Sequence, residues 1–230
     1  MKKTICFLGA LFICTIFAFS QTTETIKISG VEYPQFLAKN QYKYPEYVRA
    51  RISLKSGDMA SARINYNNFL NIMKYIDEKG DTVEIANAND INYMAVGIDT
   101  IFYDKQYYEW VASSATARLV RRHTYKESTK ALVGAFGTSS PAKNIESHEK
   151  LLNDGVSATD LTRDEEVTYL KETTYYIGAI KDDKYTFVPA TKNNINKLFP
   201  KKNIEDFIKE NKVNLNKEPD LIDLMVYISK

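Results

Sequence analysis

Apolar and polar residues alternate along much of the chain between residues 47 and 125, and this alternation predicts a series of short β-strands. In residues 48 to 54, Val48, Ala50, Ile52 and Leu54 share one parity, and Arg or Ser occupies the positions between them. Residues 59 to 66 repeat the pattern after a Gly57-Asp58 turn. The pattern predicts a β-hairpin with one buried face and one face in water.

Further alternating segments follow, separated by short polar turns. We expect strands at residues 25–28, 69–76, 82–86, 91–98, 101–103, 107–112, 115–125, 166–170, 174–180 and 185–188. Strands joined by such short turns pair antiparallel, because a parallel return needs a crossover of about a dozen residues. The sequence therefore predicts a mainly β fold with an α appendage: an antiparallel up-and-down β-meander, in a curled sheet or a sandwich.

Two regions depart from the alternation. Residues 128 to 160 are rich in Gly, Ser, Asn and Pro, and we expect a long surface loop that is the least ordered part of the chain. Residues 190 to 230 show helical spacing, with Thr191 and Asn203 as candidate N-caps and Pro219 near the start of a third helix. These helices are too short to be stable alone, so we expect their apolar residues to pack on the sheet. Those residues are Phe199, Phe207, Leu221, Leu224 and Ile228.

The first twenty residues have the pattern of a signal peptide. Lys2 and Lys3 precede an apolar run from residue 5 to residue 19, and Ala18 and Ser20 supply small residues before Gln21. A retained membrane anchor needs about 20 apolar residues, and the run from residue 5 to residue 19 is shorter than that. We expect cleavage after Ser20, a β-rich domain over residues 21–189, a helical segment over 190–230, and no transmembrane segment in the mature chain.

Signal removal changes the composition. Both cysteines leave with the signal, and the 29 basic residues that remain equal the 29 acidic ones. A neutral chain has no overall field that attracts nucleic acid, and a chain without cysteine forms no disulfide. We therefore expect an exported protein, periplasmic, outer-membrane-associated or extracellular, with no nucleic-acid partner.

The densest group of charged residues is on the predicted strand at 115–125. Arg118, Arg121, Arg122 and His123 form a candidate patch for an anion or a partner. The simpler interpretation is a solvated strand whose charges discourage pairing with other chains. On a strand, Arg118 and Arg122 share one face, and Arg121 and His123 share the other.

The remaining candidates predict no catalytic, cofactor or metal site. One acidic cluster, Asp77, Glu78 and Asp81, lacks the ligand spacing of a calcium loop and fits a hairpin turn. The acidic residues 182 and 183 also fit a hairpin turn. The two histidines, His123 and His148, have no zinc-ligand spacing. Trp110 is a candidate for stacking on a sugar, although an aromatic strand more often belongs to the core.

Several motifs together resemble a functionally uncharacterised family of exported proteins of Bacteroidota. They are residues 63–67 (RINYN), 75–81 (YIDEKGD), 96–99 (VGID), 175–178 (YYIG) and 197–200 (KLFP). These motifs are turn and packing signals. The resemblance therefore implies architecture and compartment, and no functional residue.

From these observations we expect a cell-envelope protein that acts by non-enzymatic binding or scaffolding, with an envelope protein or a glycan as its partner. Two alternatives stay open. One is a periplasmic carrier that shelters an apolar ligand in a curled sheet, and the other is a hydrolase acting on an envelope polymer. A deep apolar cavity favours the carrier, whereas a filled core favours the scaffold.

Overall fold

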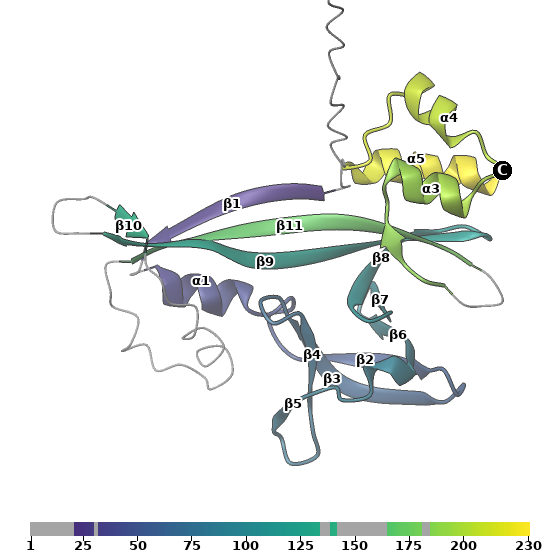
Figure 1. The fold of residues 1–230 in the computed structure, drawn as a ribbon. Helices are drawn as coiled ribbons and strands as arrows, with labels where there is room; N and C mark the ends of the chain where they lie inside the picture. The colour runs from purple at the N-terminus through teal and green to yellow at the C-terminus, as the bar shows by residue number, and fades with distance from the viewer. Residues whose placement is uncertain (1–20, 30–31, 134–138, 142–164, 181–184) are drawn as a thin grey trace, which may run out of the picture.

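The computed structural model describes residues 21–29, 32–133, 139–141, 165–180 and 185–230 (Figure 1). The expected signal peptide, most of the expected loop at 128–160, His148 and the acidic turn at 182–183 lie outside these residues.

The described strands form one open antiparallel sheet of twelve strands. Along the sheet the order is β1, β11, β9, β8, β7, β6, β2, β3, β4 and β5, while β10 pairs with β9 and β12 pairs with β11. The strands are β1 Gln21–Ser29, β2 Val48–Leu54, β3 Met59–Asn67, β4 Ile72–Ile76, β5 Thr82–Glu84, β6 Ile91–Val96, β7 Asp99–Tyr103, β8 Tyr107–Ser113, β9 Ala117–Val133, β10 Ser139–Pro141, β11 Glu165–Ala179 and β12 Val188–Pro189. The predicted β-meander with C-terminal helices is confirmed, and the sheet is not closed.

Two meanders grow outward from the central pair of β2 and β6. Through β3 and β4 the chain reaches one edge at β5, and it then returns to β6 and passes through β7, β8 and β9 to β11. β1 adds to the far side of β11, so the chain begins at the opposite edge. In Figure 1, β1, β11 and β9 form a long ribbon from which the β2–β5 end turns away.

The predicted hairpin at residues 48 to 66 is present in the expected register. Ala50 pairs with Ala62 and Ile52 with Ala60, and Gly57 has a φ of 96° in the turn. That left-handed conformation is open to glycine and strained for most other residues. Ala50 and Ile52 are buried, as their shared parity predicts, but Ser53 and Asn65, on the face expected in water, are buried as well.

The helix α1, Tyr33–Asn40, was not predicted. Pro34 lies in its first turn, where a missing backbone donor has no cost. Leu37 packs with Ile28 of β1 and with Val167 and Tyr169 of β11. The helix thus covers one side of the ribbon (Figure 1).

Several strands differ from the expected ones. The two strands expected at 166–170 and 174–180 are one continuous strand, β11. β1 is longer than expected, and β5 and β6 end two residues earlier. β9 continues to Val133, inside the expected loop, because its polar residues pair with the first part of β11. β4 begins only at Ile72, since Asn71 adopts a φ of 59° that interrupts an extended strand. The expected strand at 185–188 is reduced to β12.

Three C-terminal helices lie over one face of the sheet near β8, β9 and β11. They are α3 Lys192–Leu198, α4 Ile204–Glu210 and α5 Glu218–Ser229. The side chain of Thr191 accepts a hydrogen bond from the amide of Asn194, which confirms this N-cap. Asn203 stands at the N-cap position of α4, but its side chain makes no cap bond to the backbone. None of the described helices has the length and apolar character needed to cross a membrane.

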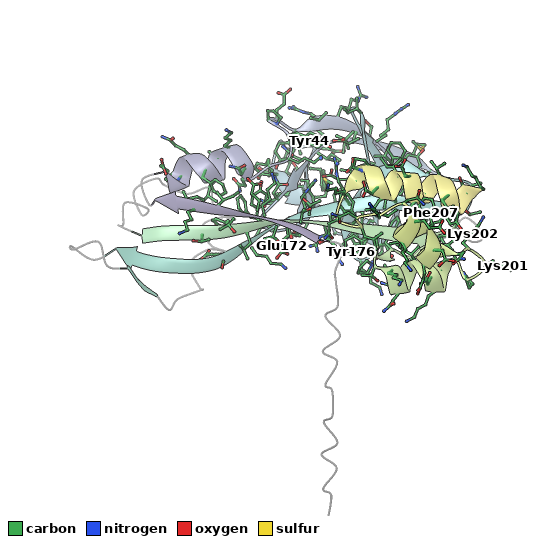
Figure 2. All side chains as sticks on the ribbon, turned by 90° about the horizontal axis from the view of Figure 1, so that it is seen from above. Tyr44, Glu172, Tyr176, Lys201, Lys202 and Phe207 are labelled. Carbon is green, nitrogen blue, oxygen red and sulfur yellow. The ribbon has the colours of Figure 1, made fainter. Side chains whose placement is uncertain are left out.

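The helices dock on the sheet as expected. Leu221, Leu224 and Ile228 are 1 to 2% exposed and pack with Leu119 of β9 and Ile177 of β11. Figure 2 shows Glu172 and Tyr176 along β11, and Lys201, Lys202 and Phe207 in the helical layer. Phe207 is only half-buried and stacks on Tyr227, with ring centroids 4.2 Å apart.

Candidate functional site

The structure divides the candidate patch on β9 into two parts. The guanidinium of Arg118 lies 4.7 Å from the ring centroids of both Phe102 and Tyr185. Arg121 instead reaches Glu218 of α5, on the face that the helices cover. Arg118 therefore does not belong to a common patch with the other three residues, and its cation–π contacts give it a packing role.

Arg121, Arg122 and His123 line one recess. Its charged and titratable lining is completed by Lys43, from the segment before β2, and by Glu109 of β8. Its other lining residues are Tyr66, Ile101, Tyr107 and Tyr108. The recess opens to solvent, and the space of about 250 Å³ in and over it includes that open solvent. We call it the basic recess.

The basic recess opens where β8 stops flanking β9. The ladder between these two strands runs from Ser113 and Arg118 to its last pair, Glu109 and Arg121. Arg122 and His123 lie beyond that pair, so side chains of either parity reach the space at the end of the ladder. This explains why Arg122 joins Arg121 and His123, although strand parity predicts opposite faces.

Five charged side chains of alternating sign run through the recess. Lys43 Nζ lies 3.5 Å from Asp99 Oδ2 and 2.7 Å from Glu109 Oε1. Arg121 lies 3.2 Å from the other oxygen of Glu109 through Nε, and 2.8 Å from Glu218 Oε2 through Nη1. Burial lowers the pKa of Arg121, but Glu109 and Glu218 outweigh burial and raise it. This charge chain connects β7, β8, β9 and α5.

Tyrosine hydroxyls add neutral polar groups to the recess and to the ends of the charge chain. Burial raises the pKa of Tyr66 to about 12 and also raises the pKa values of Tyr107 and Tyr108. All three therefore keep their protons at neutral pH and can donate hydrogen bonds. Outside the recess, Tyr44 donates to Asp99 Oδ2 at 2.8 Å and Tyr175 donates to Glu218 Oε2 at 3.4 Å.

His123 is a neutral group at physiological pH. Burial lowers its pKa, against the opposing effect of Glu109, and the charges of Arg121 and Lys43 lower it further. Its Nδ1 lies 2.8 Å from Thr173 Oγ1, and its Nε2 lies 3.9 Å from Glu109 Oε2. A catalytic triad needs a hydrogen bond between histidine and carboxylate, and 3.9 Å is too long for one.

The other candidates take structural positions. Asp77 Oδ1 accepts hydrogen bonds from the amides of Lys79 and Asp81, as expected of a hairpin turn. Within the described residues, no three His, Cys, Asp or Glu side chains gather as a metal site. Tyr107 and Tyr108 are core residues as expected, but Trp110 is 46% exposed and donates to Ser113 Oγ. The core interpretation is therefore wrong for Trp110.

Sequence alone did not indicate Lys43, Tyr66 or Glu109. Lys43 precedes Glu109 by 66 residues, and neither residue lies in a pattern associated with binding. Only the folded sheet brings them to Arg121. Comparison with known proteins finds no matching family, no matching characterised protein and no matching solved structure.

Proposed function

We propose that this chain is an exported, non-enzymatic binding protein of the cell envelope and that the basic recess is its binding site. The observation that carries this proposal is the meeting of three basic side chains and three protonated tyrosines around one recess. Convergent polar groups on rigid elements are the usual features of a ligand site. Arg121, Glu109 and Lys43 hold one another in place through the charge chain.

The recess fits a polar ligand better than an acyl chain. Its cavity volume is about 10 Å³, room for roughly one water molecule, far below the range of about 300 to 1,000 Å³ of pockets that hold drug-sized ligands. Charged side chains on several sides would be desolvated by an apolar ligand without gaining new partners. We therefore favour an envelope glycan, or a polar group on an envelope protein, over the apolar ligand of a carrier.

Hydrolysis is the second candidate, because His123 and Thr173 are hydrogen-bonded beside the recess. For acyl transfer, Thr173 would be the nucleophile and His123 its base. Glu109 is too distant from His123 to orient it, and both of its oxygens are engaged by Lys43 and Arg121. The test is whether the wild-type protein degrades envelope polymers. Activity that is lost in Thr173→Val would favour hydrolysis over binding.

The binding proposal is tested on protein purified under native conditions from the envelope fraction. We expect native mass spectrometry to detect a bound molecule that denaturation releases. His123→Phe, which fills the recess with an apolar ring, should lower its occupancy. The matched control Tyr227→Phe changes an aromatic residue of α5 that does not line the recess and should retain the bound molecule. A wild-type protein with only the mass of its polypeptide would contradict the proposal.

A further inference from the structure

Arg122 differs from the other cations of the basic recess in its lack of a carboxylate partner. Lys43 is paired with Asp99 and Glu109, and Arg121 is paired with Glu109 and Glu218. Across the described part of the chain, no ion pair involves Arg122. Its Nε is fully buried and has no hydrogen-bond partner.

The surroundings of Arg122 are tyrosines. Burial raises the pKa of both Tyr66 and Tyr108, and the charge of Arg122 opposes that effect at each ring, so the guanidinium is close to both. A hydrogen bond from Arg122 to Tyr66 also lowers the Tyr66 pKa. Phenols solvate a guanidinium but do not neutralise it. Arg122 is only partly exposed and no carboxylate neutralises its charge, so a bound anion gains a direct charge-assisted pair there.

The donors left free at Arg122 suit an oxyanion. Arg122 lines the recess, and the guanidinium N–H groups that Tyr66 does not engage can pair with an oxygen of a carboxylate or phosphate. The protonated Tyr107 and Tyr108, which line the recess, are further donors, whereas Tyr66 donates its proton to Asn71 Oδ1 at 3.4 Å. Repulsion from Glu109 is weakened, because Lys43 engages one of its oxygens and Arg121 engages the other.

We propose that the basic recess binds the oxyanion group of a small ligand, a carboxylate or a phosphate, with Arg122 as the residue that anchors it. This inference rests on the proposed binding function and specifies its ligand class.

The experiment measures thermal unfolding of the full mature chain in phosphate, in acetate and in chloride at equal ionic strength and pH. At an anion concentration about tenfold above its dissociation constant, the wild-type midpoint should rise by about 3 to 6 °C relative to chloride. A rise with phosphate alone identifies a phosphate site, and a rise with acetate alone identifies a carboxylate site.

Arg122→Met should weaken anion binding by roughly 10- to 100-fold, because it removes a charge-assisted pair. This variant should still fold in chloride, since methionine keeps much of the apolar length of the arginine side chain and no ion pair is lost. Arg122→Lys keeps the charge without the fork and should bind with intermediate affinity. The matched control Arg118→Met removes a cation from the same strand outside the recess and should respond as the wild type does.

Two results would overturn the proposal: a wild type that responds to neither anion, or an Arg122→Met variant that responds as strongly as the wild type. A neutral disaccharide is tested in parallel. A response to the disaccharide without a response to either anion rejects the oxyanion and leaves the binding function intact. If no probe has an effect and no molecule co-purifies, both proposals fail.

Discussion

Replacing Leu224 by Ala tests whether the sheet and the C-terminal helices fold as one unit. Leu224 is 1% exposed, on the face of α5 that packs against Leu119 and Ile177. Such a truncation loses the transfer free energy of the removed methyl groups and leaves a cavity, at a total cost of about 2 to 5 kcal/mol. With a urea m-value of about 2 to 3 kcal/mol/M, the unfolding midpoint should fall by about 1 to 2 M.

Two probes follow the transition in urea. The fluorescence of Trp110 reports on β8, and hydrogen exchange of the β3 amides reports on a strand four places further along the sheet. One cooperative unit requires that Leu224→Ala lowers both midpoints equally. The control Ile222→Ala changes the same helix at a position that is 36% exposed, and should cost less than about 0.5 kcal/mol. An unchanged β3 transition in Leu224→Ala would refute the single unit and make the helices a separate module.

Four further outcomes are expected. Phe207→Ala should cost about 1 to 2 kcal/mol in the same assay, less than Leu224→Ala, because its ring is half-buried against Tyr227; an equal loss would contradict this. Glu109→Gln should lower the free energy of unfolding by about 2 to 4 kcal/mol, because Lys43 and Arg121 lose their shared carboxylate. A free energy of unfolding within about 0.5 kcal/mol of the wild type would show that the charge chain does not stabilise the fold. Because the pKa of His123 is lowered in the folded state, the unfolded chain binds a proton at this histidine at higher pH than the folded chain does. The free energy of unfolding should therefore fall as the pH drops below about 6.5, and His123→Gln should reduce that pH dependence. The exported form should begin at Gln21, and an intact mass that retains residues 1–20 would disprove cleavage there.

Local sequence signals were sufficient where the structure is also local. The alternation of residues 48 to 66 and the glycine at 57 predicted the hairpin and its buried face, because neighbours in sequence pair with one another. The N-cap at Thr191 and the docking of Leu224 follow equally from short-range spacing. The residues that decide a turn, a helix cap or a helix face all lie within a short stretch of sequence.

Prediction failed where distant segments decide the outcome. The end of β9 is polar and resembles a loop, but β11 supplies its hydrogen-bonding partner. The helix α1, with Pro34 in its first turn, was missed because it packs on β1 and β11, two strands that lie far apart in sequence. The basic recess was only partly predicted, because Lys43 and Glu109 lie 66 residues apart and reach Arg121 only in the folded sheet, which no local pattern encodes.

The place of β1 in the sheet has a consequence for the order of assembly. Gln21 pairs with Thr174 and Ser29 with Glu166, whereas every other neighbouring pair in the meander from β2 to β9 joins segments much nearer in sequence. Pairings over long sequence separations form late and slowly. During synthesis β1 therefore has no partner until β11 follows, and a chain that ends before residue 165 leaves one edge of β9 open. Such an edge is a template for aggregation or for strand exchange between copies, so chaperones that hold the unfinished chain should matter most until β11 arrives.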